Sequence, residues 1–145
     1  MHVRSATLAR IDTVVAAFDK GASVASIDTT HWSTQEWLRF LDSLPRTQTA
    51  ARLAEMDKGF GLSTSPNAYL RSAWFALAIG NRYDAIVPAL DQYLGSVGRQ
   101  LLIVPLYRDL EAQGDWGKPI ARRIYAHARP TYHPLTAAAI DKILS

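Results

Sequence analysis

The chain contains no cysteine among its 145 residues. This absence excludes a disulfide framework, a thiolate metal site and a cysteine nucleophile. Long apolar runs are also missing, because the longest, at residues 73–79 and 101–106, fall far short of the roughly 20 residues that a membrane span needs. The first five residues lack the apolar core of a signal peptide. The sequence therefore predicts neither a membrane span nor thiol chemistry.

Familiar catalytic patterns are absent as well. The chain has neither the G-x-S-x-G turn of a serine hydrolase nor the G-x-x-x-x-G-K-[ST] loop that holds phosphates. No two of its four histidines stand four residues apart, so it lacks the H-E-x-x-H pair of a zinc site. His127 and His133 lie on either side of Pro130, and we interpret them as capping or surface residues. We therefore predict no catalytic and no metal-binding residue in this chain.

The residues that are present favour helices. The chain has 22 alanines and 16 leucines, and both residue types are strong helix formers. Hydrophobic residues make up 48% and charged residues 20%, a composition typical of a folded chain rather than a disordered one. The length is typical of one domain, for which about 150 residues is the usual guide. We therefore expect residues 1–145 to form a single all-α domain.

The charge distribution gives little support for a nucleic-acid partner. The formal net charge is +3, and the whole excess lies in residues 97–145, which carry seven basic and four acidic side chains. A nucleic-acid interface usually shows a denser basic stripe than this. We therefore interpret the excess as part of a solvated face.

Amphipathic segments follow one another along the whole chain. Leu8, Ile11, Val15 and Phe18 share one face of a first helix, which Gly21 ends. Seven more helices are predicted from these inward-facing residues: Trp37, Leu38, Leu41 and Leu44; Leu53 and Met56; Leu70, Trp74 and Leu77; Tyr83, Ile86, Leu90 and Leu94; Leu102, Leu106 and Leu110; Ile120, Ile124 and Ala128; Ile140 and Leu144. Eight short helices with tight turns and no convincing strand indicate an α-α superhelix, a solenoid of stacked antiparallel pairs.

Capping residues predict where several of these helices begin. Ser33 and Glu36 have the spacing of a capping box. His133 precedes a proline at the start of the last helix, and Ser65 precedes another proline in the same way. Asn81 is predicted to cap the helix that follows it.

Prolines and glycines predict further breaks in the helices. Pro45 ends the second helix, Gly59 and Gly61 close the third, and Gly95 and Gly98 separate two later ones. Pro88 and Pro105 fall inside helical patterns. We expect each to remove a backbone hydrogen bond and to kink its helix.

One basic residue has an unusual position. Arg99 follows Gly98 directly at the start of a predicted helix. Cations usually favour the opposite end, because a helix N-terminus is already partly positive. An arginine there can join the free backbone N–H groups in binding an anion. Its ordinary alternative is to pair with a nearby carboxylate and hold the helix start.

Four blocks of sequence resemble one known family. Residues 98–107 resemble a G-R-x-K-x-x-x-P-L-[FY] segment, and residues 67–74 resemble an N-[SA]-E-[IL]-R-x-[RA]-W helix. Residues 128–137 resemble a closing block with His-Pro-hydrophobic-Thr before the last helix, and residues 37–41 resemble an early helix. Together these blocks resemble the C-terminal domain of zinc aminopeptidases of the leukotriene A4 hydrolase and aminopeptidase B type, in peptidase family M1.

The resemblance implies an armadillo-like, right-handed superhelix without an active site of its own. In the family, the zinc ligands, the general base and the site for the peptide amine lie in an upstream domain, and none of them is in residues 1–145. The chain would then be the non-catalytic C-terminal domain of a longer enzyme, with no cofactor of its own and with zinc in the parent's catalytic domain. Its partners would be that intramolecular domain and the peptide substrate.

The resemblance also implies a binding residue. The Arg and the Lys of the G-R-x-K segment bind the terminal carboxylate of the peptide, so Arg99 is the expected carboxylate-binding residue. Leu101 stands where the Lys would be, so one cation is missing. Neither a peptide-length preference nor epoxide hydrolase activity therefore follows from the resemblance. Arg71 matches an arginine of the family helix and is a secondary candidate, whereas Trp74 is expected to serve packing.

Other functions stay open from the sequence alone. A helical solenoid can be a stand-alone scaffold that binds another protein, and a fold by itself does not separate that role from a peptidase domain. Nucleic-acid binding through the basic C-terminal half is the least supported. We expect a monomer that binds neither nucleic acid nor membranes. Relatives occur in the cytosol and bacterial ones can be exported, so the resemblance favours the cytosol without settling the compartment.

Overall fold

The structure is a computed structural model that describes residues 2–30, 32–97 and 99–145. His31 and Gly98 lie outside these residues, and so do the side chains of residues 2–8 and 25, Leu8 among them. The α-helices are α1 (His2–Asp19), α2 (Thr34–Ser43), α3 (Ala50–Phe60), α4 (Ala68–Gly80), α5 (Val87–Ser96), α6 (Gln100–Ala112), α7 (Gly114–Ala128) and α8 (Pro134–Leu144). Short 3₁₀-helices stand between them: η1 (Val24–Ser26), η2 (Leu62–Thr64), η3 (Asp84–Ile86) and η4 (Arg129–Thr131). No strand occurs in the described residues, and the all-α prediction is confirmed.

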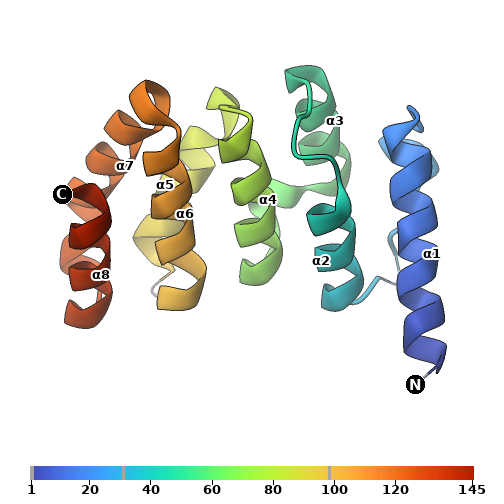
Figure 1. Ribbon diagram of the computed structural model, residues 1–145, viewed down its shortest axis with the longest axis horizontal. Coiled ribbons are helices and arrows are strands. Elements are labelled where there is room, and N and C mark those ends of the chain that lie inside the picture. Colours follow the sequence, from blue (N-terminus) through green and yellow to red (C-terminus); the bar gives the residue numbers. More distant parts are fainter. Residues whose placement is uncertain (1, 31, 98) are drawn as a thin grey trace.

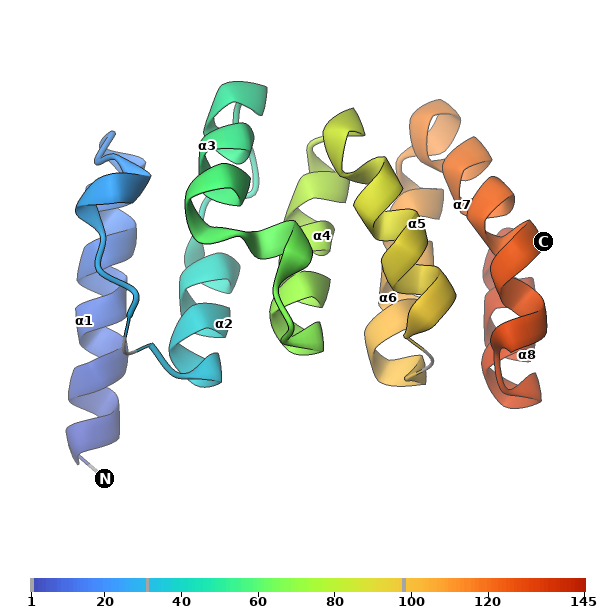
Figure 2. The same ribbon diagram turned by 180° about the vertical axis from the view of Figure 1, so that it is seen from behind.

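The helices form two layers. Helices α1, α2, α4, α6 and α8 lie side by side in one layer, while α3, α5 and α7 form the other, which faces the viewer in Figure 2. All five helices of the first layer run in the same direction, so their N-terminal ends share the lower edge in Figure 1. This is the predicted α-α superhelix, in which a short helix gains stability from its neighbours rather than from its own propensity. No helix of the described residues is both long and apolar enough to cross a membrane.

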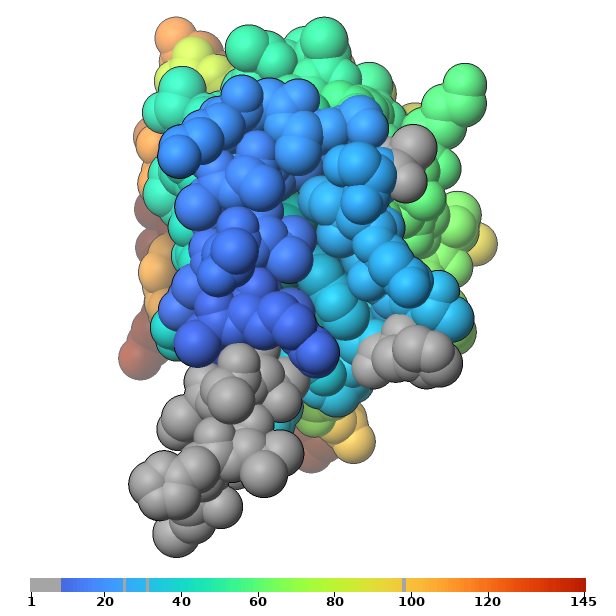
Figure 3. Space-filling view, turned by 90° about the vertical axis from the view of Figure 1, so that its right-hand side faces the viewer, coloured from blue at the N-terminus to red at the C-terminus, as the bar shows by residue number. Residues whose placement is uncertain are grey.

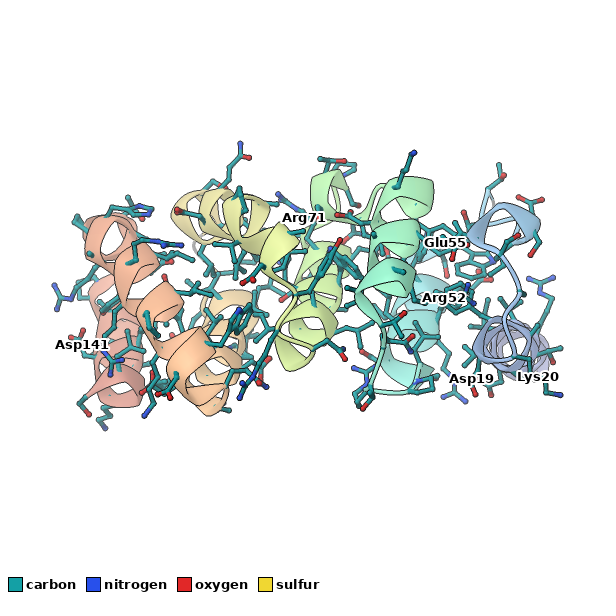
Figure 4. The ribbon with its side chains drawn as sticks, turned by 90° about the horizontal axis from the view of Figure 1, so that it is seen from above. Asp19, Lys20, Arg52, Glu55, Arg71 and Asp141 are labelled. Atoms are coloured by element: carbon teal, nitrogen blue, oxygen red, sulfur yellow. The ribbon has the colours of Figure 1, made fainter. Side chains whose placement is uncertain are left out.

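One end of the solenoid is covered by α1 and the segment that follows it (Figure 3). Arg52 of α3 donates from Nη2 to the carbonyl oxygens of Phe18 and Ala22. Glu55 accepts from the N–H of Val24 at 2.9 Å and pairs with Arg52 at 3.0 Å (Figure 4). These contacts satisfy backbone groups that the end of α1 and the following loop would otherwise leave free. The charged pair therefore attaches the first helix to the rest of the stack.

Several predicted helix boundaries are confirmed. Ser33 and Glu36 form both hydrogen bonds of the capping box, at 3.1 and 3.2 Å. Gly61, with a φ of 63°, ends α3 in the left-handed conformation that glycine adopts without strain. His133 caps α8 through Nδ1, which accepts from the N–H of Leu135 at 3.1 Å.

Two predicted helix starts are wrong. The N-cap of α4 is Asn67 rather than Ser65, and its Oδ1 accepts from the N–H of Tyr69 at 2.9 Å. Asn81 lies at the C-terminal end of α4 instead of opening the next helix. Its Nδ2 donates to the carbonyl oxygen of Leu77 at 2.9 Å, which is one of the carbonyls that a helix end leaves free. After Asn81, the 3₁₀-helix η3 takes up residues that the sequence assigned to an α-helix, whereas residues 65–67 lie between η2 and α4 in neither kind of helix.

The prolines differ from expectation in one case. Pro88 is the second residue of α5, where its missing N–H would have had no intrahelical acceptor, so the predicted helix interruption there is wrong. Pro105 does lie inside α6, as predicted. Pro119 lies inside α7, which the sequence analysis did not anticipate. Pro105 and Pro119 each remove one N–H from the hydrogen-bond ladder of their helix.

A continuous hydrophobic core runs between the two layers. Most of the predicted inward-facing residues are buried in it, and Leu90 and Ile124 have no exposed surface. Trp74 is also fully buried and donates from Nε1 to Ser63 Oγ at 2.9 Å, so its expected packing role is confirmed. Periodicity alone therefore located the core side of the helices.

Three buried tyrosines join the last helices. The hydroxyls of Tyr107 and Tyr132 lie 2.9 Å apart, and Tyr132 donates to the carbonyl oxygen of Leu94. Tyr125 donates to the carbonyl oxygen of Ala137 at 2.8 Å. Burial raises the pKa of all three hydroxyls, and raises that of Tyr125 to about 12.

These raised pKa values predict a loss of stability in alkaline solution. An unfolded tyrosine ionises at about pH 10, whereas Tyr125 keeps its proton in the folded state up to about pH 12. The folded state then binds more protons, so the free energy of unfolding should fall by about 1.4 kcal/mol per pH unit for each such tyrosine above about pH 10. Denaturant unfolding at rising pH checks this. In Tyr125→Phe, the free energy of unfolding should fall less steeply with pH than in the wild type. Equal slopes in the two proteins would contradict the raised pKa of Tyr125.

Gly117 marks a close approach of α7 to the end of α6. A Cβ at this position would lie 1.9 Å from the carbonyl oxygen of Leu110, a backbone atom that moves only with its helix. Gly117→Ala should therefore lower the free energy of unfolding by about 1–3 kcal/mol, as overpacking does. Gly80→Ala is the matched control, because nothing lies within 4 Å of its Cβ position. Equal stability of the two variants would show that the helices are not in this contact.

Candidate functional site

Arg99 opens α6, as the sequence predicted. Its carbonyl oxygen accepts from the N–H groups of Leu102 at 3.0 Å and Ile103 at 3.1 Å, which makes Arg99 the N-cap residue. Its side chain does not cap the helix. The first N–H groups of α6, which have no acceptor within the helix by position, therefore lack the side-chain partner that Ser33 or Asn67 supplies elsewhere.

The Arg99 side chain reaches across to α4. Its Nη1 donates to the hydroxyl oxygen of Tyr69 at 2.6 Å, and the guanidinium carbon lies 5.9 Å from the centre of the Tyr69 ring. Among the described residues Arg99 forms no ion pair. The ordinary alternative, in which a nearby carboxylate holds Arg99 at the helix start, therefore finds no acidic partner in the described part of the chain.

A surface cavity of about 290 Å³ lies at this contact. Its lining residues are Tyr69, Arg99, Gln100, Leu101 and Leu102. Leu101 is 89% exposed and Tyr69 is 47% exposed, so two apolar surfaces flank the cation. The cavity thus has one positive charge beside apolar side chains. Its lining residues belong to the N-terminal ends of α4 and α6, and these helix ends lie at the lower edge of the first layer in Figure 1.

Arg71, the secondary candidate, faces another part of the fold. It lies two residues after Tyr69, and two residues correspond to about 200° around a helix. Its guanidinium carbon lies 4.7 Å from the centre of the Tyr93 ring, at the contact between α4 and α5 (Figure 4). Its Nε is buried without a hydrogen-bond partner among the described residues. The structure thus brings Arg99 to Tyr69 and Arg71 to Tyr93.

Two of the histidines, His127 and His133, have structural positions. His127 Nε2 lies 2.7 Å from Asp91 Oδ1 on the surface, and His133 caps α8. In the described residues, no group of three or more His, Cys, Asp or Glu side chains is arranged to hold a metal ion. A zinc ion of the catalytic kind, which takes three protein ligands, therefore does not fit the described side chains.

Comparison with known proteins identifies the family. The chain matches the family "leukotriene A4 hydrolase, C-terminal" over residues 32–144. This chain belongs to that family. The block at residues 98–107, which resembles the family's G-R-x-K segment, includes the start of α6, and the block at residues 67–74 includes the first half of α4.

The similar proteins are aminopeptidases that are much longer than this chain. Leucine aminopeptidase 2 of Neurospora crassa is 27% identical over 120 residues, which cover 81% of this chain and 18% of that protein. Leucine aminopeptidase 2 of Chaetomium globosum is 27% identical over 86% of this chain and 20% of its own length. Human aminopeptidase RNPEPL1 is 30% identical over 86% of this chain and 17% of its own length. The chain thus spans about a fifth of these relatives.

Tyr69 is the site residue that the sequence analysis missed. In the pattern that residues 67–74 resemble, a Glu stands where this chain has Tyr69, just as the pattern that residues 98–107 resemble has a Lys where this chain has Leu101. These two departures were visible in the motifs, but they lie in separate blocks more than 30 residues apart. Only the packing of α4 against α6 shows that both face one cavity.

The metal content of the chain can be tested directly. Because the described residues offer no ligand group for a metal, the purified 145-residue chain should carry no stoichiometric zinc and should not cleave aminoacyl-arylamides. Elemental analysis and a chromogenic assay measure the two properties. Stoichiometric zinc, together with hydrolysis that a chelator abolishes, would contradict this prediction.

Proposed function

We propose that this chain is the non-catalytic C-terminal domain of a zinc metallo-aminopeptidase. Its family and its similarity to leucine aminopeptidase 2 and aminopeptidase RNPEPL1 support this role. The zinc and the groups that act on the peptide bond would belong to a catalytic domain outside these 145 residues. This domain would form one wall of the substrate cleft, and its partners would be the catalytic domain and the peptide.

In this proposal Arg99 binds the free carboxylate of a short peptide. The observation that carries it is the absence of an ion pair for Arg99 in the described residues, at a helix start that no side chain caps. A guanidinium can bind a carboxylate through two parallel N–H donors, and the N-terminal end of α6 adds a favourable field for an anion. Tyr69 accepts one N–H of Arg99 and so orients the guanidinium.

Arg71 is the second residue that we propose for this role. Its buried Nε has no hydrogen-bond partner in the described residues, so it could donate to an acceptor that enters the α4–α5 contact. The Arg71 guanidinium packs on Tyr93 and not beside the Arg99–Tyr69 pair. Arg71 would therefore bind only a ligand that reaches the α4–α5 contact.

A stand-alone interaction scaffold is the second candidate function, and one observation favours it. The large apolar side chains that are exposed in the described residues are Tyr69, Leu101 and Leu135, each the second residue of its helix. Because α4, α6 and α8 start at the same edge, these side chains lie along one border of the solenoid. The length of the natural open reading frame separates the candidates, since a zinc-peptidase sequence before Met1 would favour the aminopeptidase domain.

The role of Arg99 predicts a difference between two classes of substrate in the full-length enzyme. A hydrogen bond to a charged group contributes about 1.5–3 kcal/mol. Arg99→Ala should therefore lower kcat/KM for tripeptides by about one to two decades, at about 1.4 kcal/mol per decade. An amino-acid arylamide has no carboxylate and should be nearly unaffected. Leu101→Lys should raise peptide affinity, because it adds a second cation to the same cavity.

Two further measurements make the test specific. Arg108→Ala removes another exposed arginine of α6 outside this cavity, and it should leave the ratio of the two activities unchanged. The ratio of tripeptide to arylamide activity in Arg71→Ala shows whether Arg71 contributes to carboxylate binding. Equal losses on tripeptide and arylamide in Arg99→Ala, together with lower thermal stability, would assign Arg99 to the scaffold and reject carboxylate binding.

A further inference from the structure

The cavity beside Arg99 combines one positive charge with a mostly apolar lining. Arg99 is its cation, Gln100 is polar, and the other lining residues are Tyr69, Leu101 and Leu102. None of the described residues that line it is acidic. A ligand that fits this arrangement carries a negative charge next to an apolar group.

We propose that Tyr69, Leu101 and Leu102 form an apolar subsite that selects peptides ending in a large apolar residue. The proposal rests on the proposed carboxylate role of Arg99 and adds the side chain that accompanies that carboxylate. In the last residue of a peptide, the carboxylate and the side chain are attached to the same Cα. A group that binds the carboxylate therefore has the terminal side chain within a few ångströms.

The dimensions of the cavity suit such a side chain. Its volume of about 290 Å³ equals that of roughly ten water molecules, at about 30 Å³ each. The 2.6 Å contact between Arg99 and Tyr69 holds the phenol ring next to the guanidinium. An apolar side chain that enters removes exposed surface of Leu101 and Tyr69 from water, which is favourable.

Charged terminal residues fit this cavity poorly. A terminal Lys or Arg would bring a second cation close to Arg99, and no lining carboxylate would compensate for it. A terminal Gly would leave Leu101 and Tyr69 exposed. The hydroxyl of Tyr69 accepts from Arg99, so its own hydrogen remains a donor for the peptide carboxylate. The phenol would thus contribute both a polar and an apolar contact.

The test is a titration of the 145-residue chain with three small probes, followed through the backbone amide signals of residues 99–102. N-acetylphenylalanine carries both features, N-acetylglycine carries only the carboxylate, and N-acetylphenylalanine amide carries only the ring. Ionic strength is matched with sodium chloride. The Kd of N-acetylphenylalanine should be roughly fivefold lower than that of N-acetylglycine, which corresponds to burial of about 40 Å² of apolar surface at about 25 cal/mol per Å².

Two variants test whether Leu101 causes the difference in Kd between the two acids. Leu101→Lys should still bind both acids but bring their Kd values close together, because it replaces the apolar wall with a cation. Leu135→Lys is the matched control, since Leu135 is the exposed second residue of the neighbouring helix α8 and does not line this cavity. In Leu135→Lys, the Kd of N-acetylphenylalanine should remain lower than that of N-acetylglycine, as in the wild type.

Each result decides between the subsite and the carboxylate role. Equal Kd values for the two acids in the wild-type chain would overturn the apolar subsite and leave carboxylate binding by Arg99 intact. Equal binding of N-acetylphenylalanine and its amide would overturn recognition of the carboxylate, and the subsite with it. An absence of signal changes with either acid would overturn the subsite on this chain, while the kinetic comparison of tripeptide and arylamide judges Arg99 separately.

Discussion

The packing of α4 against α6 is the contact on which the candidate site depends. Ser72 Oγ donates to the carbonyl oxygen of Leu102 at 2.9 Å and thereby links the two helices near their N-terminal ends. One turn earlier on α4, Tyr69 meets Arg99. A shift of either helix by one residue would turn these side chains by about 100° and separate them. The cavity therefore exists only in this alignment of the two helices.

The helices of the first layer run in parallel, so their N-terminal ends lie along the same edge as the α4–α6 contact. Because α2, α4, α6 and α8 begin at the same edge as α1, the unsatisfied N–H groups of these four helices lie along this edge. Ser33, Asn67 and His133 satisfy part of that need on three of them. The start of α6 has a cation instead of a capping acceptor. Side chains therefore cap α2, α4 and α8 at this edge, whereas α6 begins with the Arg99 cation.

The helices and the core were predictable because the signals for them are local. An apolar face repeats every three to four residues, and it was sufficient to place all eight helices and the side on which residues such as Leu90 and Ile124 are buried. The errors at Ser65, Asn81 and Pro88 also have a local cause. At Asn81 and Pro88, the 3₁₀-helix η3 stands where the pattern predicted an α-helix, and both kinds of helix use the same capping residues and prolines. At Ser65, two good N-cap residues stand two positions apart, and the second of them, Asn67, opens α4.

The sequence by itself determined the helical class, the family blocks and the position of Arg99 at a helix start. Only the tertiary structure decided which residues face Arg99. Tyr69 lies 30 residues earlier and reaches Arg99 through helix packing, whereas Arg71, two residues further along α4, faces Tyr93. The physical reason is that side-chain direction around one helix is fixed by local geometry, while the contact between two helices depends on how both pack into the common core.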